Sequence, residues 1–218
     1  MNRWSRLLPF LALALLPPAT ARAAQPGVEA ARQVVAAVTE AGKRNKMQPT
    51  PLTGDALTEY YLREAAAARK LPAEKAVPAY LAAIGIALDD SDLVRRNVVF
   101  GPFCRRVESE DDRKARIAVL GQPTVRNQRD KCQHFCVSCL LVALVNPEAA
   151  EAAGLLKEQQ DMRPGGSGFS FADLAADFAG VAFAVRLRDG KTTLGALARF
   201  RAEVARVRRR VKELPGQR

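Results

Sequence analysis

The chain has 218 residues, of which 48% are hydrophobic, 26% charged and 6% aromatic. This length and apolar content suffice for one hydrophobic core, which excludes a wholly disordered chain and a large multidomain enzyme. The formal net charge is +11, and the segment 186–218 holds eleven basic and three acidic residues, a net +8. The basic character therefore belongs to the C-terminal tail.

Residues 1–23 have the pattern of a secretory signal peptide. Arg3 and Arg6 precede the apolar run LLPFLALALLPP, and the small-residue sequence ATARA follows at 19–23. The run is shorter than the about 20 apolar residues that a membrane-spanning helix needs. We therefore expect an exported protein, periplasmic or secreted, that is soluble after removal of the signal. Because all four cysteines lie far from this segment, we expect no lipid anchor.

The segment 24–54 is rich in alanine and then polar, which predicts a helix over Val28–Ala41 followed by a linker. Asp55 offers a helix cap, and the strong helix formers of YYLREAAAARK predict a helix up to Lys70.

Pro72 ends that helix, and a second one over Ala73–Leu88 buries one apolar face. The sequence DDSD at 89–92 then predicts a turn.

Three apolar segments of helical length follow, separated by turn signals at Asn146-Pro147 and at PGGSG. They predict helices over 128–145, 148–161 and 170–187. Patterns of period two are nearly absent, so we expect an all-α fold, an irregular helical bundle whose main domain spans 55–185.

Polar residues recur at helical spacing in this second half. Asp130, His134 and Ser138 are four residues apart and so lie on one stripe of a helix, and His134 is the only histidine. Glu158 and Asp161 share a face of the next helix.

Ser170 and Asp173 fit a capping box, in which the Asp173 side chain would bond back to Ser170. Asp177 is one turn further on the same face. Gly180 and Ala184 continue this face with small residues, which would let a neighbouring helix come close.

Three motifs carry a resemblance to known families: DKxxHFxxS at Asp130–Ser138, GxxKExxD at Gly154–Asp161, and GSGFSxxDxxxDxxG at Gly166–Gly180. Together they resemble the small periplasmic lipoproteins of the YfiM type. More distantly, their order is similar to that of VanZ-like membrane proteins. The resemblance covers about residues 128–184 and implies a cell-envelope location, but no reaction. Membrane anchoring is not implied, because the chain lacks a lipobox cysteine and clear transmembrane spans.

These polar residues allow a functional interpretation in which three helices converge on one site. Carboxylates and an imidazole inside a bundle can hold a divalent metal ion, which would activate a water for hydrolysis. In this interpretation the metal ligands are His134, Glu158, Asp173 and Asp177. Without a metal, His134 oriented by Asp130 would act as a general base.

Two other interpretations remain open. The residues would form a structural hydrogen-bond network in which Lys157 pairs with a carboxylate and His134 bridges two helices, or they would be scattered over the surface. Burying four carboxylates requires a cation or shared protons, which weighs against a purely structural network.

Cys132, Cys136 and Cys139 have the spacing CxxxCxxC, which holds iron–sulfur clusters in other proteins. On a helix of an exported chain they fall on one side, nearly opposite His134, and we therefore exclude a cluster or a zinc site. We interpret them as small core residues. The alternative is one disulfide from Cys104 to a member of the trio.

The tail predicts a basic amphipathic helix over 192–214. Its arginines would bind an anionic membrane surface or another envelope polyanion; alternatively, its apolar stripe packs on the bundle. Nucleic acid is not an expected partner of an exported chain.

We thus expect an exported helical protein of the cell envelope that serves as a structural or binding module. The alternative is a metal-dependent hydrolase or transferase acting on an envelope lipid or glycan.

If residues 1–23 are a signal peptide, mass spectrometry of exported material will find an N-terminus between Arg22 and Gln25. The reason is that signal peptidase cleaves after small residues that follow a short apolar run. Recovery of the intact Met1 terminus outside the cytoplasm would contradict the prediction.

Overall fold

The computed structural model describes residues 26–68 and 73–197, and this part of the chain is an all-α bundle. Within it no β-strand forms, and only two isolated β-bridges join loop residues. The predicted fold class is therefore confirmed. The predicted signal peptide, and the predicted tail helix from residue 198 onward, lie outside the described residues.

The N-terminal half contains three long helices followed by three shorter ones. The long helices are α2 (Val28–Lys46), α3 (Gly54–Ala67) and α4 (Ala73–Ala87). The shorter helices are α5 (Leu93–Arg96), α6 (Gly101–Val107) and α7 (Glu110–Leu120). The C-terminal half contains α8 (Arg129–Leu144), α9 (Pro147–Asp161) and α10 (Phe171–Arg188).

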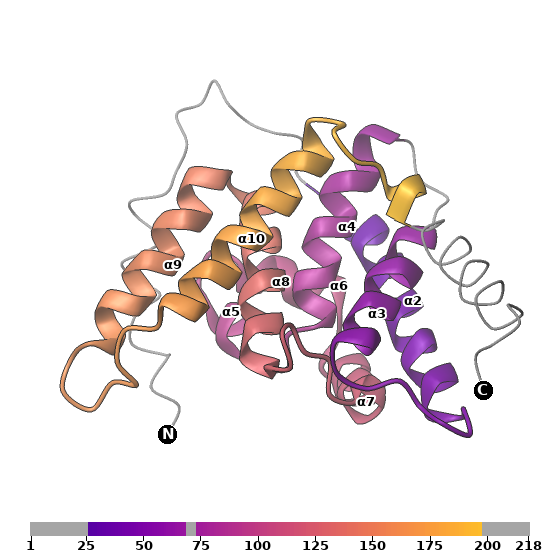
Figure 1. Ribbon diagram of the computed structural model, residues 1–218. Helices are drawn as coiled ribbons and strands as arrows, with labels where there is room; N and C mark the ends of the chain where they lie inside the picture. The colour runs from indigo at the N-terminus through magenta and orange to yellow at the C-terminus, as the bar shows by residue number, and fades with distance from the viewer. Residues whose placement is uncertain (1–25, 69–72, 198–218) are drawn as a thin grey trace, which may run out of the picture.

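The core of the bundle lies around α4 and α8, which pack against each other (Figure 1). On one side α8 contacts α9 and α10, and on the other side α4 contacts α2 and α3. The segment 24–54, expected to precede the helical domain, thus contributes α2 to the same bundle. Nearly every side chain over 79–88 is buried, because α4 is covered on all sides.

The three C-terminal helices begin and end within one residue of their predicted bounds. The starts of α9 and α10 are fixed by side-chain caps, since Asn146 accepts a hydrogen bond from the N–H of Ala149 (2.7 Å) and Ser170 accepts one from that of Asp173 (3.2 Å). The bounds of α2 and α3 were predicted less well: α2 extends five residues past Ala41.

The short helices α5, α6 and α7 were not predicted, because ion pairs rather than apolar periodicity hold them. Arg116 of α7 is 1% exposed and contacts both carboxylate oxygens of Glu108, at 2.6 and 3.1 Å. Its guanidinium also donates to the carbonyl of Ala87 (2.7 Å). This one side chain therefore ties α7 to the end of α4 and to the residue that follows α6.

Glycines allow α8 to approach both of its main neighbours closely. A Cβ on Gly180 of α10 would overlap the carbonyl oxygen of Phe135, and one on Gly85 of α4 would overlap the side chain of Leu140. At the same contact, the thiol of Cys139 donates to the carbonyl of Gly180 (3.3 Å). The expected role of Gly180 as a small residue at a helix contact is confirmed.

The four cysteines are free and buried. Cys132 lies 3.6 Å from the hydroxyl of Thr58, and Cys136 and Cys139 are completely buried. Burial raises the pKa of Cys104 to about 12 and that of Cys139 further still. The interpretation of the trio as core residues is confirmed, and none of the four forms the disulfide considered as the alternative.

Among the described helices, none combines the length and the apolar character that crossing a membrane requires.

Replacing Gly180 by alanine is expected to lower the free energy of unfolding by about 1–3 kcal/mol, because the added methyl group collides with α8. In a helix interior, alanine is normally more stabilising than glycine by about 1 kcal/mol. The expected change in the free energy of unfolding therefore has the opposite sign to the usual one. Urea unfolding measures the effect.

The control is Ala179→Leu, which adds a larger side chain at the exposed position next to Gly180 on the same helix. It should change the free energy of unfolding by less than about 0.5 kcal/mol. A Gly180→Ala protein as stable as the wild type would contradict the close contact of α8 and α10.

Candidate functional site

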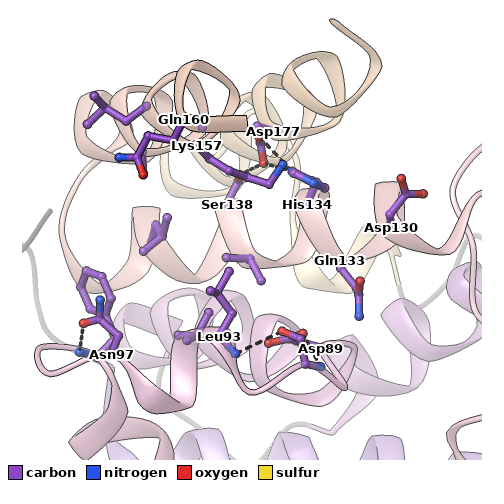
Figure 2. Close-up of a pocket in the computed structure, with 18 residues that line it drawn as sticks. Asp89, Leu93, Asn97, Asp130, Gln133, His134, Ser138, Lys157, Gln160 and Asp177 are labelled. Atoms are coloured by element: carbon purple, nitrogen blue, oxygen red, sulfur yellow. Dashed lines mark hydrogen bonds and ion pairs between the residues drawn. The ribbon is translucent and has the colours of Figure 1, made fainter. Parts of the chain in front are cut away.

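A cavity of about 200 Å³ lies between α8 and α9 on one side and the segment 89–100 on the other (Figure 2). Apolar side chains form much of its wall: Leu93, Val94, Phe100, Val137, Leu141, Ala153 and Leu156. The polar groups that line it come from the same elements and, in the case of Asp177, from α10. Such a cavity, apolar with a few placed polar groups, is typical of small-molecule binding sites.

Asp177 of α10 joins two residues of α8 at this cavity. Both of its carboxylate oxygens lie 3.1 Å from Nδ1 of His134, and its Oδ1 accepts a hydrogen bond from Ser138 (2.9 Å). Gly154 of α9 leaves room for it, since a Cβ there would press on the carboxylate. Because Nδ1–H donates to Asp177, the lone pair of a neutral His134 ring is on Nε2.

Lys157 of α9 lies among three carboxylates. Its Nζ is 2.6 Å from Glu158, 3.1 Å from Asp161 and 3.6 Å from Asp173. Burial lowers the pKa of Lys157, but the hydrogen bonds to Glu158 and Asp161 more than compensate, and the pKa is raised. Lys157 is therefore a cation inside the acidic cluster.

Glu158 is completely buried, and both of its carboxylate oxygens are used. Oε1 accepts from Lys157 (2.6 Å), and Oε2 accepts from the backbone N–H of Ser170 (2.7 Å). The predicted capping box is thus half correct: Ser170 caps the N–H of Asp173, but Glu158 rather than Asp173 bonds back to Ser170. The longer Glu158 side chain reaches this N–H from the preceding helix.

Asp173 pairs with cations instead. It forms an ion pair with Lys131 of α8, and its Oδ2 is 3.6 Å from both His134 Nε2 and Lys157 Nζ. Burial alone would raise the pKa of Asp173, but the hydrogen bond to Lys131 and the charges of His134 and Lys157 bring it below its usual value.

The expected pair of Asp130 and His134 does not form in the described part of the chain. Asp130 bonds to the side chain (2.7 Å) and the backbone N–H (3.0 Å) of Lys131, and its side chain is 57% exposed. Figure 2 shows it pointing away from His134. The physical reason is that Lys131, held by Asp173, draws the Asp130 carboxylate to itself. Asp177 takes the place expected of Asp130.

The structure brings three of the predicted metal ligands together. His134, Glu158 and Asp173 can each offer one ligand atom, and these atoms lie within 4.8 Å of one another. The fourth, Asp177, contacts Nδ1 of His134 instead. Carboxylates commonly orient a metal-binding histidine through the ring nitrogen that does not bind the metal.

The described cluster is acidic overall. Its carboxylates are Asp130, Glu158, Asp161, Asp173 and Asp177, and its ammonium groups are those of Lys131 and Lys157. With His134 neutral, three negative charges remain. A further cation or a proton on His134 would lower this charge.

Asp89 lies on the opposite wall, at the turn predicted for 89–92. It is 6% exposed, and its carboxylate accepts from the N–H of Ser91 (2.8 Å). Burial raises the pKa of Asp89 to about 6, despite that hydrogen bond and the charges of Arg116 and Arg113.

The cavity is also lined by Asp89, Asn97 and Gln160, which no pattern in the sequence indicates as site residues. Asp89 was interpreted only as part of a turn. Neither Asn97 nor Gln160 is a defining position of a sequence motif. Only the packing of the segment 89–100 against α8 and α9 brings them to the site.

Compared with protein-family models, with curated proteins and with solved structures, the chain has no match. The three motifs behind the YfiM-type resemblance meet in space, since α8, α9 and the start of α10 build one polar cluster. A functional assignment therefore depends on the geometry of this cluster and of the cavity beside it.

Asp89→Asn is expected to raise the free energy of unfolding at about pH 7.5 by about 2–3 kcal/mol, because a raised pKa means that the native state disfavours the ionised carboxylate. The wild type loses this stability as the pH rises from about 4 through about 6, whereas the asparagine does not titrate and still accepts from Ser91. Urea unfolding of both proteins at about pH 4 and 7.5 measures the difference, which should vanish at the lower pH. Equal stabilities at both pH values would contradict the raised pKa.

Proposed function

We propose that the chain is an exported binding module of the cell envelope that takes up a small, mainly apolar molecule in the cavity beside His134. The cavity itself is the observation that carries this proposal. Its apolar wall would desolvate a ligand, and the polar group of His134, Ser138 and Asp177 would orient it. Export is supported by the signal-peptide pattern of residues 1–23, and the envelope location by the motif resemblance.

The pairing of the polar residues favours binding over nucleophilic catalysis. The hydroxyl of Ser138 donates to Asp177 and not to His134, so this serine is not activated by the imidazole. Glu158 has both oxygens occupied by protein donors. Groups that are already hydrogen-bonded to one another hold a fixed geometry. This suits the orientation of a ligand better than nucleophilic attack on that ligand.

The volume sets the size of the ligand. An apolar cavity of about 150 Å³ takes up benzene. With about 200 Å³, this cavity has room for one ring with a short substituent, or for a short alkyl chain with a small polar head.

A second function is favoured by the ligand geometry of His134, Glu158 and Asp173. It is a metal-dependent hydrolase or transferase acting on an envelope lipid or glycan. A divalent ion held there would act as a Lewis acid, and Asp177 would orient His134 through Nδ1. Lys157, whose Nζ lies 2.6 Å from Glu158 and 3.6 Å from Asp173, competes with the ion for the same carboxylates.

Toluene is expected to bind the full chain in the cavity, as seen by shifts in the NMR signals of Val137 and Leu141. Ala153→Phe should weaken this binding at least about tenfold, because the added ring occupies the space that toluene would fill.

Ala175→Phe is the matched control, because Ala175 is exposed on α10 and does not line the cavity. If toluene binds the Ala153→Phe protein as well as the control, the cavity is not the binding site.

If the second function applies, the purified chain dialysed against zinc will retain one ion, measured by elemental analysis. His134→Ala should then lose the ion and keep the helical content measured by circular dichroism, because it removes one ligand of three.

Asp130→Asn is the control, since this carboxylate is turned away from His134 and should leave the zinc content unchanged. A wild-type chain that retains no zinc would rule out this metal site.

A further inference from the structure

Two buried polar atoms at the cavity have no hydrogen-bond partner among the described residues: Nδ2 of Asn97 and Oε1 of Gln160. Both residues line the cavity. Buried polar groups in folded proteins are nearly always hydrogen-bonded, so two exceptions at one cavity call for a ligand that completes them.

The donor of Asn97 is held in a fixed orientation. The residue is 1% exposed, and its Oδ1 accepts from the backbone N–H groups of Val99 (2.8 Å) and Phe100 (3.0 Å) at the start of α6. Turning the amide over would place its NH₂ group against these two N–H donors, which excludes the reversed orientation. The NH₂ group of Asn97 is therefore left to donate elsewhere.

The acceptor of Gln160 comes from the other wall. Gln160 lies near the end of α9, and Figure 2 shows it across the cavity from Asn97, at the end remote from Asp130. Its Oε1 is buried. The polar side chains of His134 and Lys157 lie at a different place in the cavity, further along α8 and α9. The cavity thus has a second polar end, separate from the acidic cluster.

We propose that Asn97 and Gln160 form a recognition site for an uncharged amide group. This inference rests on the proposed function, because it requires that the cavity binds a small molecule. The Nδ2 of Asn97 would donate to the amide oxygen, and the Oε1 of Gln160 would accept from the amide N–H. The apolar part of the ligand would lie along Phe100 and Leu156.

Other head groups satisfy only one of the two atoms. A carboxylate or an ester has no hydrogen to donate to Gln160, and an ammonium cannot accept from Asn97. A hydroxyl presents donor and acceptor on a single oxygen, whereas the two side chains come from opposite walls. An amide carries them on separate atoms and so fits both.

The test measures dissociation constants of the full chain for hexanamide, methyl pentanoate and toluene by NMR titration. Hexanamide and methyl pentanoate have equal numbers of non-hydrogen atoms, and both accept a hydrogen bond, but only the amide donates one. Gln160→Met keeps the length of the side chain and removes the acceptor. It should reduce the preference for hexanamide over methyl pentanoate about fivefold, the effect of one neutral hydrogen bond.

Asn97→Asp tests the other atom, because it keeps the oxygen that accepts from Val99 and Phe100 and removes the donor. It should weaken hexanamide and methyl pentanoate alike, each about fivefold or more relative to toluene, since both ligands offer a carbonyl oxygen.

Three results are distinguishable. If toluene, methyl pentanoate and hexanamide all fail to bind the wild type, the proposed binding function is wrong. The amide site is then excluded as well. If they bind but the Gln160→Met and Asn97→Asp proteins keep the wild-type ratios of dissociation constants, cavity binding stands and the amide site is overturned. Changed ratios in the expected directions support both.

Discussion

The close approach of α8 to both α4 and α10 is the constraint on which the site depends. Gly85 and Gly180 leave no side chain between the helices, so backbone meets side chain or backbone directly on both sides of α8. At this separation the short carboxylate of Asp177 reaches Nδ1 of His134, and that of Asp173 reaches Lys131. A larger residue at Gly180 would push α10 away from α8 and break these short polar contacts. The spacing of the backbones therefore sets the geometry of the polar cluster.

Compensation of charge explains how so many carboxylates lie together at partly buried positions. Lys131 bridges Asp130 and Asp173, and Lys157 contacts Glu158 and Asp173 from the other side. Each ammonium is held by more than one carboxylate, which lowers the cost of removing it from water. The same pairing has a functional consequence, because the centre of the cluster already contains cations. A divalent ion would have to displace Lys157 from its carboxylates, whereas a ligand in the cavity need not.

The second half of the fold could be predicted from the sequence because the residues that start and end its helices act locally. Asn146 and Ser170 cap the helices they precede, and the four-residue spacing of polar residues correctly places His134 on the side of α8 that faces Asp177. The choice among carboxylates could not be predicted, because spacing along one helix does not tell which neighbouring helix supplies the partner. Beyond the turn at 89–92, the segment up to residue 100 could not be predicted, for a related reason. The buried guanidinium of Arg116 holds Ala87 before this segment and Glu108 after it, and such long-range contacts leave no periodic pattern in the sequence.

The two walls of the cavity are held in different ways, and this difference accounts for the position of its unpaired groups. The wall formed by α8 and α9 is braced by Asp177 and by the acidic cluster, so its polar side chains are paired with one another. The opposite wall is held by the ion pair of Arg116 with Glu108 and by the side chain of Asn97, whose Oδ1 accepts from the backbone N–H of Phe100 just before α6. Each wall therefore has its own polar support, and Arg129 and Gln133 of α8 also join the two walls through Asp90. Nδ2 of Asn97 and Oε1 of Gln160 are the buried atoms of these walls that neither support uses.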